Sequence, residues 1–154
     1  TNDAPSAMTR MVDLGVPNYL VASSVVAVLA QRLVRVVCGK CKQPHTPSEG
    51  DLELAGITPE QVAKATFMKG AGCNACNMGG YRGRIGIYEL MMMTSKIREL
   101  VFQNAAAVDI RSVAVKEGMS TLYTDGIDKV VRGVTTIEEV FRVAKRTEDD
   151  AAAA

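Results

Sequence analysis

Four cysteines form two matching pairs in this chain, and their spacing points to a metal site. Cys38 and Cys41 flank Gly-Lys, Cys73 and Cys76 flank Asn-Ala, and the sequence contains no other cysteine. A Cys-x-x-Cys turn directs two sulfurs into one hemisphere, so two such turns brought face to face make the tetrahedral four-sulfur cage that zinc prefers. When all four ligands come from the protein, no position is left for water or substrate. The sequence therefore predicts a structural zinc site.

Other chemistries of four thiols stay open at this point, each with a reason against it. Chance rarely leaves four buried free cysteines in two matching pairs. Two internal disulfides need an oxidising compartment, and no signal peptide is visible. A redox-active Cys-x-x-Cys usually comes singly and opens a helix in a βαβ setting. Iron in a rubredoxin-like cage would use the same ligands, although zinc asks only for tetrahedral thiolates.

Four thiolates around one divalent cation carry net negative charge, which nearby donors must stabilise. Lys40 and Lys42 bracket Cys41, and the glycine-rich turns expose backbone N–H groups to the sulfurs. His45 is the only histidine in the chain and lies four residues after Cys41. We do not expect it to be a ligand, because a fourth cysteine already completes the site.

Length and composition favour a packed globular protein. At 154 residues the chain can hold one core or two small ones. Its 47% apolar content, 5% aromatic content and lack of Trp predict aliphatic packing with methionine as filler. Lysine and arginine number 18 against 17 acids, for a net charge of +1. A nucleic-acid binder is expected to carry a strongly basic balance or patch, so we expect no nucleic-acid partner.

The longest uncharged stretch runs from Leu14 to Gln31, about the length of a membrane span. Pro17 and several polar residues interrupt it, and Arg32 and Arg35 follow, so we expect no membrane span. We expect instead a helix over Tyr19–Val37 in a core or at a domain junction. Its inward side chains would be Leu20, Val25, Val28, Leu29 and Leu33.

Two helix starts lie between the cysteine pairs. Thr46-Pro47-Ser48-Glu49 and Thr58-Pro59-Glu60-Gln61 each combine a threonine N-cap, a proline at the first helical position and a Glu or Gln at the third. Gly56 is expected to end the first helix. The insertion is thus predicted to be a small helical finger held at its base by both cysteine pairs.

Residues 81–90 follow the second cysteine pair and alternate as a strand does, with Ile85, Ile87 and Met91 expected on one face. Arg82 and Arg84 stand on alternate residues of this strand and are expected to point to the same side. Their guanidinium groups would suit carboxylate or phosphate partners across a subunit boundary. The alternative is a pair of solvated charges.

Four helices are predicted after this strand, each with capping or stop signals. They are expected at residues 95–102, 107–117, 122–132 and 137–145, packed as a compact bundle. The tail at 147–154, with its terminal alanines, is expected to fray.

No motif for catalysis is present in these 154 residues. There is no Gly-x-x-x-x-Gly-Lys-Ser/Thr phosphate loop, and the glycines after Cys76 lack both the lysine and the helix that such a loop opens. One histidine without a nucleophile beside it gives neither a triad nor a metal-hydrolase site. Residue types and spacing alone indicate a domain that a bound zinc ion stabilises.

Several segments carry a resemblance that goes further. They are Thr1-Asn2-Asp3-Ala4-Pro5-Ser6-Ala7, Val21-Ala22-Ser23-Ser24, Ala30–Arg35, Gly83–Glu89 and the run from Gly118 to Val140. In this order they resemble the carboxy-terminal part of the secretion traffic ATPases, the GspE/PilB group that drives type II secretion and type IV pilus assembly. The resemblance runs from Thr1 to about Lys145, and the tetracysteine insertion distinguishes this group from the shorter retraction ATPases.

The resemblance implies an α+β, predominantly helical fold in five parts. These are the end of a RecA-like ATPase core (1–37), a zinc-binding tetracysteine subdomain (38–80), a returning core strand (81–93), a C-terminal helical subdomain (94–146) and a tail (147–154). It also implies that the Walker A, Asp-box and Walker B elements lie upstream. ATP and Mg²⁺ would then be bound and used by the intact parent protein, and this fragment alone would be inactive.

The same resemblance implies partners and a location. Such ATPases work as hexameric rings, so the partners would be neighbouring subunits of a homohexamer and the inner-membrane platform protein of a secretion or pilus machine. The location would be cytoplasmic and peripheral to the inner membrane. A stand-alone zinc ribbon that binds nucleic acid and a thiol-redox module are the alternatives, which a DNA shift assay at low salt and metal analysis before and after reduction would separate.

Overall fold

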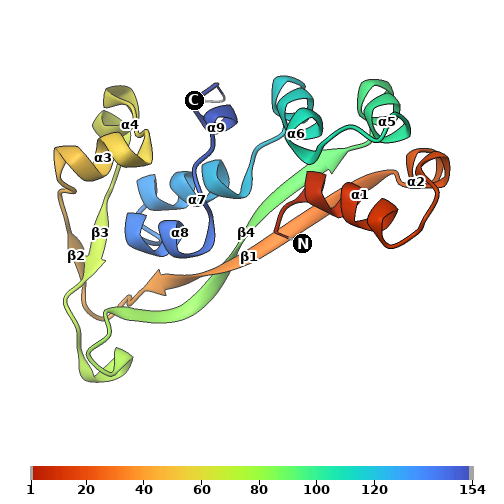
Figure 1. The fold of residues 1–154 in the computed structure, drawn as a ribbon. Coiled ribbons are helices and arrows are strands. Elements are labelled where there is room, and N and C mark those ends of the chain that lie inside the picture. The colour runs from red at the N-terminus through yellow and green to blue at the C-terminus, as the bar shows by residue number, and fades with distance from the viewer. Residues whose placement is uncertain (1, 153–154) are drawn as a thin grey trace. The chain divides into compact units, whose positions relative to one another are not determined.

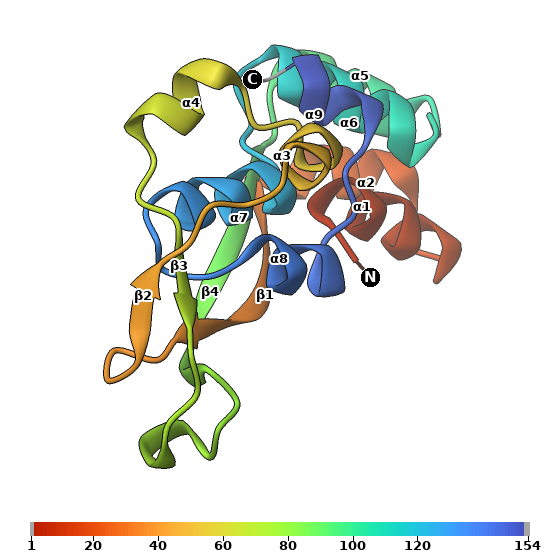
Figure 2. The same ribbon diagram turned by 90° about the vertical axis from the view of Figure 1, so that its left-hand side faces the viewer.

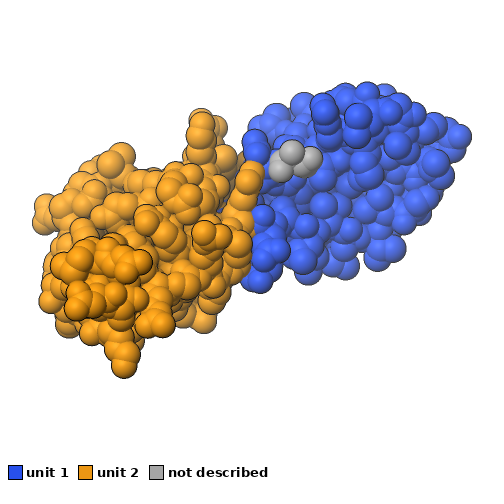
Figure 3. Space-filling model, turned by 90° about the horizontal axis from the view of Figure 1, so that it is seen from below, with its two compact units in different colours: residues 1–31, 88–122, 153 blue, residues 32–87, 123–152, 154 orange. Residues whose placement is uncertain are grey.

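The computed structural model describes residues 2–152 of the chain (Figure 1). Contacts between residues divide it into two compact units, which are described separately (Figure 3). Unit 1 contains residues 2–31 and 88–122, and unit 2 contains residues 32–87 and 123–152. Strands β1 (Ala27–Val37) and β4 (Tyr81–Met92) pair with each other, and each contributes residues to both units.

Unit 1 is held together by a core of aliphatic and methionine side chains. Helices α1 (Ala4–Asp13), α2 (Asn18–Ser24), α5 (Ser95–Phe102) and α6 (Ala107–Lys116) contribute to it, as does the end of β4. Burying these side chains together removes their apolar surface from water, which favours the folded state. The buried members are Ala4, Met8, Val21, Ala22, Met91, Met93, Ile97, Val101, Ile110, Ala114 and Met119.

Two carboxylates fix the backbone at the start of α1 in unit 1. Asp3 caps the helix by accepting the N–H of Ser6 at 2.8 Å. Glu89 is buried on β4 and accepts the N–H of Ala4 at 2.8 Å and that of Leu122 at 3.2 Å. Burial raises the pKa of Glu89, although both N–H donors oppose the shift.

The helix expected over Tyr19–Val37 is wrong. The helix ends at Ser24, and after two residues the chain continues as β1. Exposure alternates along most of β1, as in a strand with one buried face, and Leu29 and Leu33 are 61% and 46% exposed instead of inward. Side chains branched at Cβ favour a strand over a helix, because a helix restricts their χ1 rotation. The segment is rich in them: Val25, Val26, Val28, Val34, Val36 and Val37.

Unit 2 contains a short β-hairpin that the sequence analysis missed. Its strands β2 (Lys42–Pro44) and β3 (Met68–Gly70) are antiparallel. Helices α3 (Glu49–Ala55) and α4 (Pro59–Lys64) lie at one end of the hairpin, and the loop that follows β3 lies at the other (Figures 1 and 2). The predicted finger therefore has its two helices, but the hairpin separates them from the cysteines.

The helical end of this finger packs on the C-terminal part of unit 2, which contains α7 (Leu122–Val131), α8 (Ile137–Val143) and α9 (Glu148–Ala152). The Tyr123 hydroxyl donates to the Ala55 carbonyl at 3.0 Å, and the Thr66 N–H donates to the Val131 carbonyl at 2.8 Å. Arg146 donates to the carbonyls at the end of α3, at 3.2 and 3.3 Å. These bonds fix the helical end of the finger to the C-terminal part of unit 2.

The capping signals of the finger are confirmed for one helix and shifted for the other. Thr58 and Gln61 form the expected capping box of α4. Helix α3 is capped by Ser48, whose Oγ accepts the N–H of Asp51 at 3.1 Å, and not by Thr46. Ser48 is itself a good cap with an acid three residues later, so the helix starts two residues beyond the expected position. It ends before Gly56, as expected.

The strand predicted after the second cysteine pair is confirmed as β4 and extends to Met92. Ile87 and Met91 are fully buried, as expected, whereas Ile85 is 37% exposed. The residue between Ile87 and Met91 on the buried face is Glu89. The start of the strand therefore buries less than its alternation predicts.

Four helices follow β4 as predicted, ending within two residues of the expected positions. Helices α5 and α6 belong to unit 1, and α7 and α8 belong to unit 2 after Leu122, so the helices are divided between two compact units and do not form one bundle.

The expected fraying of the tail is wrong for residues 147–152. Helix α9 forms there, and buried Asp150 accepts the N–H of Thr147 at 2.6 Å. Residues 153–154 of the predicted tail, and Thr1, lie outside the described residues. Within residues 2–152, every helix is too short or too polar to cross a membrane.

Candidate metal centre

The structure brings all four cysteines together in unit 2. Their sulfur atoms lie within 4.8 Å of one another, and the cysteines are not paired in disulfides. The Sγ atoms are 3.9 Å apart between Cys38 and Cys73, 3.8 Å between Cys41 and Cys76, and 3.8 Å between Cys73 and Cys76. The two pairs therefore face each other, as the sequence predicts.

These separations fit a tetrahedral metal. With Zn–S bonds of about 2.3 Å, the sulfurs of a regular tetrahedron are about 3.8 Å apart. The separations between sulfurs given above match that edge, whereas a disulfide would need about 2.05 Å. The four thiols can thus hold one ion with little movement of the backbone.

Ends of strands and tight turns position the four cysteines. Cys38 directly follows β1, and Cys41 directly precedes β2. Cys73 directly precedes the short 3₁₀ helix at Asn74–Cys76, and Cys76 is the last residue of that helix. Each pair is closed by the same backbone hydrogen bond, from the N–H of the second cysteine to the carbonyl of the first, at 3.2 and 3.1 Å. This shared geometry points both sulfurs of a pair in one direction.

Close packing of two glycines holds the cysteine loop against β3. A Cβ atom built on Gly70 would lie 2.0 Å from the carbonyl oxygen of Gly80, and one on Gly80 would lie 2.7 Å from that of Gly70. No side chain fits at either position without moving the backbone. The carbonyl of Gly80 also accepts the N–H of Cys38 at 2.9 Å, which links the second loop to the first cysteine pair.

Backbone N–H groups supply hydrogen bonds to the sulfurs. The N–H groups of Cys73 and Gly80 donate to Sγ of Cys76 at 3.2 and 3.3 Å. Burial opposes ionisation of Cys76, but these donors lower its pKa to about 6. Burial raises the pKa of Cys41 to about 12, helped by hydrogen bonds with the other thiols. One thiolate in the cluster is thus favoured, and further ionisation needs a cation among the sulfurs.

Other residues expected near the site have different places. Among the described residues, Lys40 and Lys42 make no hydrogen bond to a sulfur, and their expected role falls to the backbone N–H groups. His45 is not part of the ligand cluster found in that part of the chain. Its own N–H pairs with the carbonyl of Phe67 across the hairpin, at 3.0 Å.

Arg82 and Arg84 both lie exposed near the start of β4. Gly83, between them, has φ +82°, a left-handed conformation that interrupts the pleat of a strand. The strand alternation that placed both side chains on one side therefore does not apply here. Arg84 lines an open concavity of unit 2 whose lining does not include Arg82.

A charged cluster in the same unit was missed by the sequence analysis. Glu139 is almost fully buried at the start of α8, and its carboxylate accepts hydrogen bonds from Arg35 on β1 and from Arg142. It also accepts the backbone N–H of Arg35 at 2.9 Å. Burial opposes ionisation of Glu139, but the two arginines lower its pKa to about 2. The only sequence signal was a glutamate in a capping position, which predicts a bond to the N-cap backbone instead.

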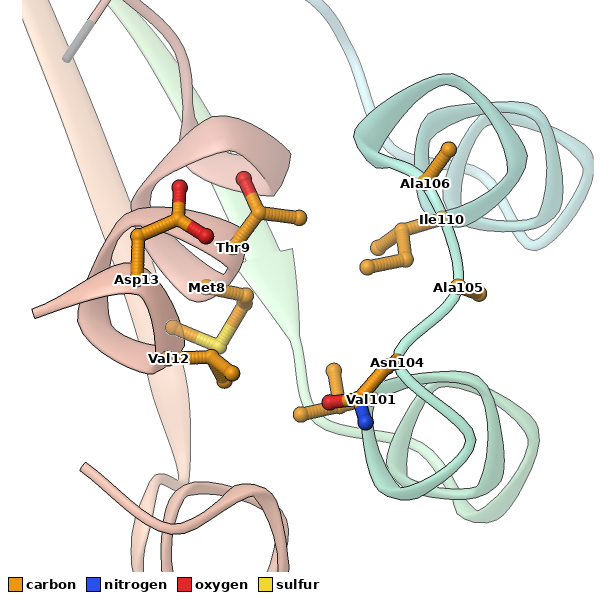
Figure 4. A pocket seen from close by; sticks show the side chains of 9 residues that line it. All are labelled: Met8, Thr9, Val12, Asp13, Val101, Asn104, Ala105, Ala106 and Ile110. Carbon is orange, nitrogen blue, oxygen red and sulfur yellow. The ribbon is translucent and has the colours of Figure 1, made fainter. Parts of the chain in front are cut away.

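Unit 1 contains a cavity of about 180 Å³ that no predicted site residue lines (Figure 4). Met8, Val12, Val101 and Ile110 form its apolar wall, and three polar side chains, those of Thr9, Asp13 and Asn104, also line it. A single carboxylate beside an apolar wall is not a constellation for catalysis.

Comparison with known proteins gives one consistent family. Residues 1–142 match the family model described as Type II/IV secretion system protein. The chain is 43% identical over 145 residues to Type II secretion system protein E of Pseudomonas aeruginosa, and 40% identical over 141 residues to Type IV pilus assembly ATPase PilB of Myxococcus xanthus.

These alignments cover nearly all of this chain but only part of each relative. They include 94% and 91% of this chain, against 28% and 25% of the two relatives. The chain thus spans about a quarter of the length of these curated relatives. The resemblance inferred from the sequence is confirmed: the chain belongs to the family of type II/IV secretion system proteins.

Proposed function

We propose that this chain is the C-terminal, zinc-stapled portion of a hexameric ATPase that powers type II protein secretion or type IV pilus assembly. The observation that carries the proposal is the family match over residues 1–142, shared with proteins named for both processes. The cysteine cluster adds independent support from the geometry of its four sulfurs.

In this proposal the metal is zinc and its role is structural. Four thiols at tetrahedral separations supply a complete ligand set, so the ion has no open position for a substrate. When bound, zinc would offset part of the negative charge of the thiolates and connect the loops before β2 and after β3. It would thereby fix the cysteine end of the hairpin.

Residues 1–37 and 81–93 are proposed to be the end of a RecA-like ATPase core, residues 38–80 the zinc-binding subdomain, and residues 94–146 a C-terminal helical subdomain. The pairing of β1 with β4 supports placing the first and third segments side by side. Residues 1–154 contain no phosphate-binding loop, so ATP and Mg²⁺ would bind in the intact protein.

The proposed partners are neighbouring subunits of the hexamer and the platform protein of the machine at the inner membrane, reached from the cytoplasm. Arg82 and Arg84 are proposed contacts to a neighbouring subunit. Both are exposed on unit 2, and guanidinium groups suit carboxylate or phosphate partners across a boundary.

The test compares the complete gene product with this chain alone. The complete protein should hydrolyse ATP and form hexamers by mass photometry, whereas purified residues 1–154 should show no turnover above a buffer control. Both should contain about one zinc per chain. An inactive complete protein would contradict the ATPase proposal, and protein prepared without chelators that lacks both zinc and iron would contradict the metal site.

A further inference from the structure

Three arginines surround one concavity of unit 2. The concavity has a volume of about 520 Å³, opens to solvent, and is lined by Leu33, Arg35, Arg84 and Arg142. These residues come from β1, β4 and α8, so the fold brings together charges that lie far apart in the sequence. We call this set the three-arginine site.

Positive charge at the three-arginine site is only partly compensated. Glu139 is the carboxylate that Arg35 and Arg142 share, at 2.5 and 3.1 Å. Its neighbour Glu138 lies 3.5 Å from the amine of Lys69. Three guanidinium groups line the concavity, and two of them share one carboxylate, which leaves two positive charges without a counter-ion among the groups that line it.

Two of the arginines are held in place with donors to spare. Arg35 and Arg142 each bind Glu139 through Nε and Nη2, which leaves their Nη1 groups unused in these bonds. The guanidinium of Arg35 also lies 4.3 Å from the ring centre of Tyr81, a cation–π contact that restricts it further. Donors held in this way lose little conformational entropy when a ligand binds.

Arg84 differs from the other two arginines in its contacts. Within residues 2–152 it makes no hydrogen bond or ion pair, although Arg35 and Arg142 on the same concavity do. An anion that enters the concavity would give this guanidinium the charged partner that Arg35 and Arg142 already have. Its guanidinium is available for such a ligand.

We propose that the three-arginine site binds a phosphate group. A phosphate monoester carries a charge of about −1.5 to −2 at neutral pH, which matches the two uncompensated charges, whereas one carboxylate would leave a positive charge over. Guanidinium groups bind phosphate oxygens through two parallel N–H bonds. Leu33 gives the concavity one apolar wall against which the rest of a small phosphorylated ligand can lie. The proposal does not depend on ring assembly or on ATP hydrolysis.

The primary test titrates inorganic phosphate into the purified, zinc-loaded protein and follows binding by calorimetry and by ³¹P NMR. Arg84→Ala should weaken phosphate binding by about tenfold or more, because it removes charge-assisted hydrogen bonds. Arg82→Ala is the matched control: it removes the same charge two residues away, outside the concavity, and should change the affinity less than about twofold. Zinc content and melting temperature should be the same in both variants.

A second arm separates two sources of the phosphate group, a free small molecule and a lipid headgroup. Vesicles of phosphatidylcholine with and without phosphatidic acid are added to the same three proteins. Binding of free phosphate that Arg84→Ala weakens supports a small-molecule ligand, and binding of phosphatidic acid vesicles alone, with the same dependence, supports a lipid headgroup. Equal losses in Arg82→Ala and Arg84→Ala, or no saturable binding of either probe, would overturn the proposal.

Discussion

The two units of this protein are stabilised in different ways. Unit 1 has a continuous core of buried aliphatic and methionine side chains, contributed by four helices and a strand. Unit 2 also buries apolar side chains, among them Val34, Ile87 and Val140, and adds to them a cluster of four thiols and a buried carboxylate shared by two arginines. Its hairpin strands have three residues each, and α4 buries none of its residues.

The difference shows why the cysteines belong in unit 2. Helices of six or seven residues and a two-stranded hairpin are not stable in water by themselves. Helices α1, α5 and α6 of unit 1 have eight to ten residues and bury apolar faces against one another. A metal can supply to the finger of unit 2 what apolar burial supplies to unit 1.

The largest expected effect is loss of the metal centre. Cys73→Ser should abolish metal binding and unfold residues 38–80 locally, because the folding free energy from structural zinc is on the order of 10 kcal/mol in small finger peptides. Hydrogen exchange with mass spectrometry should show lost protection in these residues and unchanged protection in α1, α5 and α6. Met78→Ala is the control, since Met78 lies in the same loop with 68% of its surface exposed.

The two units differ in their dependence on the metal only if unit 1 keeps its protection from hydrogen exchange in the Cys73→Ser protein. Faster exchange in α1 or α5 of the Cys73→Ser protein would show that the metal also supports the apolar core, and the comparison would fail. Full protection of residues 38–80 after complete metal removal would instead show that the contacts with α7 and Arg146 are enough.

The next effect concerns the core of unit 1. Met91 is fully buried, and truncation of a buried methionine to alanine typically costs about 2–5 kcal/mol. Met91→Ala should lower the free energy of unfolding by that amount and leave the zinc content unchanged. Met92→Ala, one residue later with 53% exposure, should stay within about 0.5 kcal/mol of the wild type. Urea denaturation and metal analysis of the three proteins provide the measurement.

A smaller effect is expected at the buried carboxylate of unit 2. Glu139→Gln weakens the bonds to Arg35 and Arg142 and should cost about 1–3 kcal/mol at pH 7. Glu138→Gln is the matched control, because Glu138 is 65% exposed and its pair with Lys69 at 3.5 Å is a surface pair. Equal losses in the two variants would show that the buried bonds add nothing beyond surface electrostatics.

The same carboxylate predicts a pH dependence. The pKa of Glu139 is lowered from its usual 4.5 to about 2 in the folded protein. Its ionised form therefore stabilises the fold above pH 4.5, and this contribution is lost as the pH falls toward 2. As the pH falls from 4.5 to about 2, the free energy of unfolding measured by urea denaturation should decrease more steeply for the wild type than for Glu139→Gln. Parallel curves for the two proteins would contradict the assigned shift.

The smallest effect tests a helix start within the finger. Ser48→Ala should destabilise α3 by about 1 kcal/mol, because the Ser48 side chain caps the N–H of Asp51. Thr46→Ala, at the position expected from the sequence, should have no measurable effect. Hydrogen exchange of residues 49–55 distinguishes the two. A larger loss of protection in Thr46→Ala than in Ser48→Ala would show that Thr46 caps α3, as the sequence predicts.

Prediction from the sequence succeeded where the signal was local. The capping box at Thr58 and the start of α5 after Thr94 depend on residues within one helical turn. The strand β4 was predicted from its alternation, with Ile87 and Met91 buried as expected. The helix predicted over Tyr19–Val37 was wrong because the deciding contact is not local. The apolar run suits a helix or a strand, and pairing with β4, more than 40 residues away in sequence, selects the strand.

The sequence by itself identified the four cysteines that the structure brings together, because two Cys-x-x-Cys turns carry their geometry with them, and it identified the family through ordered motifs. Only the tertiary structure decided that Gly83, between the two arginines of β4, has a positive φ and that Arg84 shares a concavity with Arg35 and Arg142. It also decided that Glu139 binds Arg35 instead of its own helix start. These contacts join residues about 50 to 100 positions apart in the sequence. A local pattern carries no information on partners at that distance, because the pairing of distant chain segments, and not the propensity of each residue, brings them together.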